Sequence, residues 1–196
     1  MKGHYIVFEG IDGSGKTSIC SEISDSLIQR GYKVLQISEP SNSEIGSLLR
    51  NQMKNLHINQ TSLALLYAAD SYDLQESIED CYDFIVSDRN YLSTVAYQMM
   101  AIDKEWLLML HRFLKQPDMV FYLDVTVEAA IERIESRNGS IDFFETSESL
   151  LKVKSNYEKL ISDGLGLKVF SIETVGKSQS VVAQNVMKII QEQLSL

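Results

Sequence analysis

The sequence predicts an α/β domain in which helices cover both faces of an open, parallel, five-stranded sheet. Short apolar runs alternate with longer amphipathic segments along the chain, which is typical of α/β proteins. The apolar runs place Val, Ile, Phe and Tyr on consecutive positions, as strands buried on both faces do. With 196 residues, of which 44% are hydrophobic, the chain can bury one core. We therefore expect a single domain over residues 1–196.

The expected strands follow from the apolar runs, and the expected helices from the segments between them. The first helix should end at Gln29-Arg30-Gly31, because glycine commonly follows the last helical residue. We find no internal repeat, low-complexity segment or proline-rich linker that would divide the chain. The predicted strands are residues 4–9, 32–38, 82–88, 119–125 and 167–173, and the predicted helices are residues 16–30, 61–80, 91–100, 103–115, 126–136, 147–162 and 178–193.

Charge and cysteine content narrow the class of protein. The formal charge is −9, which argues against a nucleic-acid or anionic-membrane partner, because such partners need a basic surface. Cys20 and Cys81 have neither metal-site nor disulfide spacing, so we expect two buried thiols in a reducing compartment. The apolar run near the start of the chain is too short for a signal or membrane segment. These features together predict a cytoplasmic protein.

A glycine-rich loop follows the first predicted strand. Residues 10–17 read G-I-D-G-S-G-K-T and match G-x-x-x-x-G-K-[ST], the P-loop pattern. Its glycines let backbone N–H groups surround phosphates, and the following helix N-terminus adds a positive dipole end. Lys16 can then reach the β- and γ-phosphates, while Thr17 can offer its hydroxyl to Mg²⁺. The alternative is a flexible turn before a helix.

A second polar pair ends the third predicted strand. Asp88 stands where P-loop proteins place a carboxylate near the metal, although an aspartate here can also cap the next segment. Arg89 follows directly at the edge of the sheet where open α/β proteins bind ligands. A guanidinium at this edge suits bidentate phosphate recognition.

Other P-loop classes fit less well. The chain has no guanine-reading N-K-x-D sequence, which a GTPase requires, and it is too short for an ABC-type or motor ATPase. A small chain with a P-loop and an Asp-Arg strand end instead indicates a nucleoside monophosphate kinase.

At this point the chain resembles a known family, the thymidylate kinases, over nearly its whole length. The P-loop is shared by many enzymes, whereas the run from Asp88 to Gln98 is far more specific, since it is similar to the family's D-R-x-x-x-S-x-x-A-Y-Q. The similar segments are FEGIDGSGKT (8–17), SEP (38–40, like R-E-P), EIGSLLR (44–50), LLYAAD (65–70, like L-L-F-A-A-D), SDRNYLSTVAYQ (87–98) and PDMVFYLDV (117–125).

The resemblance implies roles for matching residues. Asp12 would hold the acceptor's 3′-hydroxyl, Arg89 would grip its phosphate, and Tyr97 would lie against the sugar and disfavour a 2′-hydroxyl. Gln98 would face the pyrimidine. On residue chemistry alone, Tyr97 is as well explained as a core residue and Arg50 as a solvated helix end. The residues expected to bind the acceptor are Asp12, Glu39, Pro40, Arg50, Tyr67, Ser71, Arg89, Thr94, Tyr97 and Gln98. Those expected to bind ATP are Gly10, Ile11, Asp12, Gly13, Ser14, Gly15, Lys16, Thr17, Ser18, Arg133 and Arg137. Those expected to bind the metal are Thr17 and Asp88.

Two departures from the family pattern bear on function. Ser71 stands where the family has an arginine that contacts the pyrimidine, and Tyr67 replaces a stacking Phe. Tyrosine can stack equally well, but serine cannot replace a charge-assisted donor. The sequence therefore predicts dTMP as the acceptor with a range that can extend to dUMP.

The second departure lies in a lid predicted at about residues 136–146. The P-loop carries no arginine, and the family's bacterial type then supplies transition-state arginines from the lid. Arg133 and Arg137 are four residues apart and share a helix face, but Phe143 replaces another expected arginine. Arg137 is thus the candidate mobile cation, and the alternative is an exposed arginine at a helix end.

These expectations combine into one function and two alternatives. The sequence predicts an ATP-dependent dTMP kinase that uses Mg²⁺, with Asp12, Lys16, Arg89 and Arg137 as its catalytic groups and no general base. The resemblance also implies a homodimer. One alternative is a nucleoside kinase that phosphorylates a 5′-hydroxyl, with Glu39 as its base. Another is a regulator that binds nucleotide without transferring phosphate.

Overall fold

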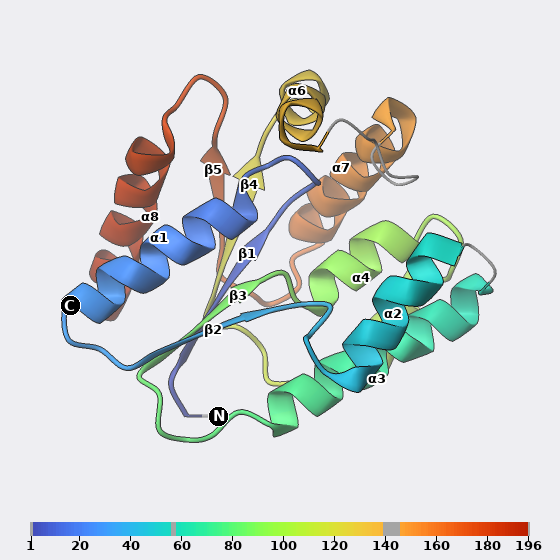
Figure 1. The fold of residues 1–196 in the computed structure, drawn as a ribbon, viewed down its shortest axis with the longest axis horizontal. Helices are drawn as coiled ribbons and strands as arrows, with labels where there is room; N and C mark the ends of the chain where they lie inside the picture. The colour runs from blue at the N-terminus through green and yellow to red at the C-terminus, as the bar shows by residue number, and fades with distance from the viewer. Residues whose placement is uncertain (1, 56–57, 139–145, 196) are drawn as a thin grey trace.

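A computed structural model of the chain describes residues 2–55, 58–138 and 146–195, without the side chains of residues 54, 55, 137 and 138. Its centre is a parallel sheet in the order β2-β3-β1-β4-β5 (Figure 1). The prediction of an open, parallel, five-stranded sheet is therefore confirmed. The strands are β1 (His4–Glu9), β2 (Val34–Ser38), β3 (Phe84–Asp88), β4 (Met119–Asp124) and β5 (Val169–Glu173).

Helices flank the sheet, and most of them begin and end within two or three residues of the predicted bounds. The helix α2 was not expected. Its sequence contains Gly46, which weakens a helical pattern, but a Cβ at Gly46 would lie 2.0 Å from the carbonyl oxygen of Ser41. The glycine is therefore a packing requirement inside a helix. The helices are α1 (Lys16–Gln29), α2 (Glu44–Asn55), α3 (Gln60–Glu76), α4 (Tyr91–Gln98), α5 (Lys104–Leu110), α6 (Val127–Asn138), α7 (Ser147–Ser162) and α8 (Gln179–Leu194).

The two faces of the sheet carry separate hydrophobic cores. On one face, α1 and α8 pack side chains such as Ile23 and Val186 against Phe8 and Phe121. On the other face, α3 to α7 enclose a second core (Figure 1). Because β1 lies between both layers, its side chains from Tyr5 to Phe8 are fully buried, which explains its unbroken apolar run.

The expectation of two buried thiols is wrong for one of them. Cys20 faces the core from α1, whereas Cys81 is exposed because it lies in the turn before β3. Within the described ranges, no helix is long and apolar enough to cross a membrane.

Candidate active site

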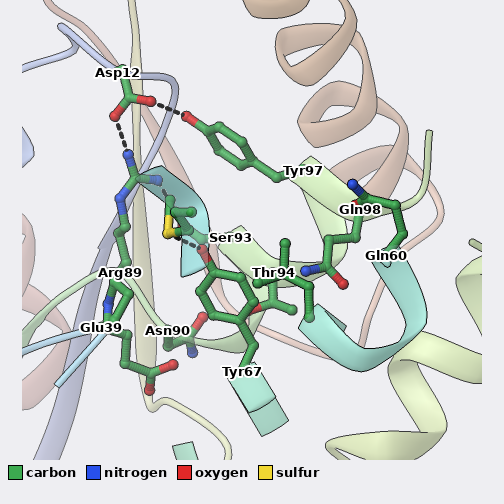
Figure 2. Close-up of a pocket in the computed structure, with 13 residues that line it drawn as sticks. Asp12, Glu39, Gln60, Tyr67, Arg89, Asn90, Ser93, Thr94, Tyr97 and Gln98 are labelled. Carbon is green, nitrogen blue, oxygen red and sulfur yellow. Dashed lines mark hydrogen bonds and ion pairs between the residues drawn. The ribbon is translucent and has the colours of Figure 1, made fainter. Parts of the chain in front are cut away.

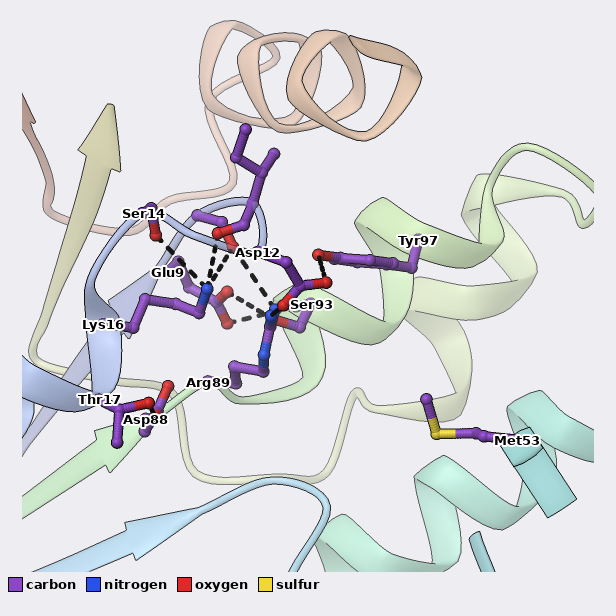
Figure 3. Close-up of polar contacts among 12 residues, drawn as sticks. Glu9, Asp12, Ser14, Lys16, Thr17, Met53, Asp88, Arg89, Ser93 and Tyr97 are labelled. Carbon is purple, nitrogen blue, oxygen red and sulfur yellow. Dashed lines mark hydrogen bonds and ion pairs between the residues drawn. The ribbon is translucent and has the colours of Figure 1, made fainter. Parts of the chain in front are cut away.

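The P-loop joins β1 to α1 and curls around the amine of Lys16. Gly13 and Gly15 adopt positive φ angles of 78° and 95°, and a Cβ at Gly13 would lie 2.3 Å from the carbonyl oxygen of Ala130. Lys16 Nζ donates hydrogen bonds to the carbonyl oxygens of Gly10 at 3.0 Å and Ile11 at 2.8 Å (Figure 3). The loop therefore holds its cation ready and partly desolvated.

The charge state of Lys16 is sensitive to this enclosure. Burial lowers its pKa to about 8, with a further contribution from Arg89, while Asp12 and Asp88 oppose the shift. An incoming polyphosphate would favour the protonated amine, because opposite charges stabilise each other strongly in a buried site.

Thr17 and Asp88 meet at the carboxyl edge of the sheet. Thr17 Oγ1 donates to Asp88 Oδ2 at 2.5 Å, as Figure 3 shows, and Asp88 Oδ1 is buried without a hydrogen-bond partner among the described residues. Hydroxyl and carboxylate oxygens are ligands that Mg²⁺ accepts, so this pair fits the expected metal. No cluster of three or more His, Cys, Asp or Glu suited to a metal occurs in the described part of the chain.

Arg89 and Asp12 form an ion pair beside the P-loop. Arg89 Nη2 lies 2.5 Å from Asp12 Oδ1, and Tyr97 donates its hydroxyl to Asp12 Oδ2 at 2.8 Å (Figure 2). Burial would raise the pKa of Asp12, but Arg89, Lys16 and the hydrogen bonds outweigh it and hold the pKa below its ordinary value. Two groups predicted to touch the acceptor thus neutralise each other here.

A pocket opens beside this ion pair, between α3 and α4. Asp12 and Arg89 stand at one end, whereas Gln60 and Gln98 stand at the other (Figure 2). Eight of the ten residues predicted for the acceptor line it; the lining comprises Asp12, Glu39, Pro40, Met53, Gln60, Leu63, Tyr67, Arg89, Asn90, Ser93, Thr94, Tyr97 and Gln98.

The other two predicted acceptor residues lie behind the pocket wall. Ser71 is fully buried and donates its hydroxyl to Glu39 Oε2 at 2.6 Å. Arg50 donates to the carbonyl oxygens of Pro40 at 3.1 Å and Ser41 at 2.5 Å. In this structure both residues support the Glu39-Pro40 segment and do not line the pocket.

Glu39 is a nearly buried carboxyl group in the pocket wall. Only 7% of the residue is exposed, and in the part of the chain that the structure describes Oε1 has no hydrogen-bond partner. Its pKa is raised to about 8, chiefly by burial and to a smaller extent by the nearby carboxylates of Asp70 and Glu9, while the Ser71 hydrogen bond opposes the shift. At neutral pH the group is therefore mainly the uncharged acid.

Sequence reasoning missed Glu9, which organises the segment that carries Arg89. Its carboxylate accepts hydrogen bonds from the backbone N–H groups of Asn90 at 2.9 Å and Ser93 at 3.3 Å. It also accepts from the hydroxyls of Ser93 at 2.6 Å and Tyr157 at 2.7 Å. The available signal was a charged residue that ends an otherwise apolar strand, since a buried charge needs partners.

Five further lining residues were also missed. Asn90 and Ser93 belong to the same run as Arg89, so they had a signal in the sequence. Met53, Gln60 and Leu63 had none, because only the tertiary packing of α2 and α3 brings them to the pocket.

A second, shallower pocket borders the other side of the P-loop. It is lined by Ser14, Gly15, Ser18 and Arg133, among others. Arg133 Nη2 donates to the carbonyl oxygen of Thr174 at 3.1 Å, and Nη1 donates to Thr174 Oγ1 at 3.2 Å. The side chain of Arg137 and most of the predicted lid, including Phe143, lie outside the described residues.

Comparisons with known proteins agree with this geometry. The probable thymidylate kinase of Methanobrevibacter smithii is 39% identical over 163 residues, which is 81% of each chain. The thymidylate kinase of Brachyspira hyodysenteriae is 39% identical over 160 residues, or 78% of each chain. The structure of thymidylate kinase from Candida albicans shares the fold, with a TM-score of 0.82 at 23% identity over 98% of this chain and 92% of that chain. A family model for thymidylate kinase matches residues 8–186, and the chain therefore belongs to the thymidylate kinase family of ATP-dependent kinases.

Proposed function

We propose that this enzyme transfers the γ-phosphate of ATP to dTMP and that the residues between its two pockets carry the reaction. The observation that supports this most is the ion pair of Arg89 and Asp12, at 2.5 Å, which lies between the P-loop and the enclosed pocket (Figures 2 and 3). A nucleoside monophosphate offers one phosphate and one sugar hydroxyl, and the pair offers one cation and one anion to receive them.

The proposed mechanism depends on positioning and positive charge. Arg89 leaves Asp12 and grips the acceptor phosphate, and Asp12 accepts a hydrogen bond from the sugar hydroxyl. Lys16 neutralises charge on the β- and γ-phosphates. Thr17 and Asp88 would hold Mg²⁺, which supplies charge neutralisation between the phosphates when bound. Because the acceptor phosphate is already ionised at neutral pH, the transfer needs no general base.

The donor side of the proposal rests on the second pocket. The P-loop residues from Gly10 to Ser18 would surround the triphosphate, and Arg133 would flank it from α6, where it now contacts Thr174. Arg137 stays a prediction as the mobile cation of the lid.

The nucleoside kinase alternative is disfavoured by Glu39. A general base must be ionised to accept a proton, but burial raises the pKa of Glu39 to about 8. One of its oxygens is also occupied by the Ser71 hydroxyl at 2.6 Å. Glu39 is therefore mostly protonated where the enzyme would work.

Three finer statements belong to the proposal. We propose that dUMP is also accepted, because Leu63 and its neighbours offer no group that needs the thymine methyl.

A homodimer is supported by the exposed apolar side chains of Met109 and Phe113, which are 55% and 77% exposed. Light scattering after size exclusion tests the oligomeric state. We also propose a cytoplasmic location.

One assay tests the proposed function. ADP release is measured with Mg·ATP and either dTMP, dUMP, UMP, GMP or thymidine. We expect dTMP to give the highest rate, dUMP a lower one and UMP very little, because Tyr97 and Asp12 close the sugar site. Absence of ADP release with every monophosphate would contradict a kinase, and a faster rate with thymidine than with dTMP would favour the nucleoside kinase.

A further inference from the structure

The end of the acceptor pocket that lies away from the P-loop is formed by two helix faces. Thr94 and Gln98 are one turn apart on α4, and Leu63 and Tyr67 are one turn apart on α3. Figure 2 shows Gln98 and Gln60 at this end, with Asp12 and Arg89 at the other. If the monophosphate rests on Arg89, its base must lie between these helices.

The side-chain amide of Gln98 makes no hydrogen bond to the described part of the protein. Its residue is only 4% exposed, and neither Oε1 nor Nε2 has a hydrogen-bond partner among the described residues. Buried polar groups are nearly always paired in native proteins. The side chain lines the pocket, so its amide is available to a bound ligand.

Among the side chains that the structure describes, none supplies a cation to this end of the pocket. Arg89 is the one lysine or arginine among the described lining residues, and its guanidinium contacts Asp12 and Ser93 at the opposite end. Ser71 does not reach the pocket because its hydroxyl is donated to Glu39. The polar groups toward this end of the pocket are the amide of Gln98, the amide of Gln60 and the hydroxyl of Thr94.

Each of these groups can either donate or accept a hydrogen bond. Thymine and uracil present a donor at N3 and an acceptor at O4, whereas cytosine presents an acceptor at N3 and a donor at N4. A guanidinium only donates, so it would favour O4 and repel the cytosine amine. A side-chain amide presents either pattern after rotating by half a turn.

We propose that this enzyme also phosphorylates dCMP, with Gln98 turning its amide to match either cytosine or thymine. The inference rests on the proposed function and extends its acceptor class to both pyrimidine types. A phosphate oxygen of dCMP forms the new bond to the γ-phosphorus of ATP while the bond from that phosphorus to the β–γ bridging oxygen breaks. The products are dCDP and ADP.

The test compares dTMP and dCMP as acceptors with the full-length enzyme and Mg·ATP. We expect ADP release with both, with kcat/KM values within about tenfold of each other, because each base finds two hydrogen bonds. Turnover of dTMP with a kcat/KM for dCMP more than a hundredfold lower would overturn this inference and leave the proposed function intact. Absence of turnover with both would overturn the proposed function as well.

Variants then test whether the amide of Gln98 hydrogen-bonds to the base. Gln98→Met keeps the length of the side chain but removes both polar atoms, so kcat/KM should fall at least tenfold for dTMP and for dCMP, with an unchanged KM for ATP. Gln184→Met makes the same substitution at an exposed position of α8 and should change neither. A loss confined to dTMP would overturn the assignment of Gln98 to cytosine.

Ser71→Arg introduces a guanidinium, which can only donate hydrogen bonds, beside the pocket. It should raise the ratio of kcat/KM for dTMP over dCMP by at least tenfold, and an unchanged ratio in a folded variant would overturn the argument from the missing cation. Because Ser71 is fully buried, thermal unfolding checks the variant first. If it is unfolded, titration of the native enzyme with dCMP in a calorimeter decides, since absence of binding at millimolar dCMP would overturn the proposal.

Discussion

The two ends of the acceptor pocket differ in how completely their polar groups are paired. Near the P-loop, Lys16, Arg89 and Asp12 all have charged or hydrogen-bonded partners within the protein. At the far end, both polar atoms of Gln98 lack a partner among the described residues. The charged groups near the P-loop are thus already paired within the protein before substrate arrives, and in the proposed mechanism Arg89 and Asp12 exchange each other for the phosphate and sugar of the acceptor. The side chains proposed to contact the base are uncharged.

The strongest test of this contrast removes charge from the paired end. Lys16→Ala should lower kcat by about a hundredfold or more, the usual loss for a group that stabilises transition-state charge. The matched control is Lys188→Ala, because Lys188 is 77% exposed on α8. Steady-state ADP release measures both, and circular dichroism checks that both are folded. A nearly normal rate for Lys16→Ala would rule out its proposed grip on the phosphates.

A smaller effect is expected from a substitution of Glu9, which positions Arg89 without touching substrate. Glu9→Gln keeps the shape of the side chain, but an amide cannot accept all four of the hydrogen bonds that Glu9 accepts. We expect the free energy of unfolding to fall by about 1–3 kcal/mol, and kcat/KM for dTMP to fall about tenfold. The KM for ATP should not change, because the P-loop keeps its own contacts.

Tyr157→Phe is a milder change at the same site, because it removes only one of the four hydrogen-bond donors to Glu9. Its loss in kcat/KM for dTMP should be smaller than that of Glu9→Gln. If both variants lose stability but keep the native kcat/KM for dTMP, Glu9 is structural and does not position Arg89.

A last test concerns pH. Burial raises the pKa of Glu39 from 4.5 to about 8, so the folded protein binds more protons than the unfolded chain between these values. Stability contributed by this group is therefore present below about pH 4.5 and is lost as pH rises through about 8. At about 1.4 kcal/mol per pKa unit, this amounts to several kcal/mol, so the thermal unfolding temperature of the native protein should fall by about ten degrees over this window.

Glu39→Gln is the matched control for that shift. It should flatten the pH dependence of unfolding relative to the native protein. Glu9 also has a raised pKa through burial and acts with the same sign, so the difference between native and variant is the quantity to compare. Identical slopes would show that Glu39 is ionised in the folded protein.

The sequence was informative wherever a local pattern determines the structure. The strand β1 was predicted from its consecutive apolar residues, and the P-loop from its glycine spacing. Thr17 and Asp88 were both assigned to the metal because P-loop proteins place a hydroxyl and a carboxylate there, and the structure brings the two together across 71 positions. The strand and the loop have their physical cause within a few residues, whereas the position of Asp88 was predicted from the P-loop pattern.

The sequence was uninformative wherever a partner comes from a distant element. Ser71 marked a departure from the family pattern, but nothing local indicated that its hydroxyl contacts Glu39, 32 positions away. The partners of Glu9 come from α4 and α7, and no spacing rule connects them. Helix α2 was missed because Gly46 weakens its pattern while tertiary packing against Ser41 requires it.

The ion pair of Arg89 and Asp12 has a consequence for ligand discrimination. Any anion that takes Arg89 must break a contact of 2.5 Å and leave Asp12 with Tyr97 as its hydrogen-bond donor. Inorganic phosphate can replace only the carboxylate, so it exchanges one ionic contact for another and gains little. In the proposed mechanism, a nucleotide also supplies a sugar hydroxyl to Asp12. We therefore infer that the pair favours a ligand that carries both phosphate and sugar, and that it limits binding of free phosphate at the acceptor site.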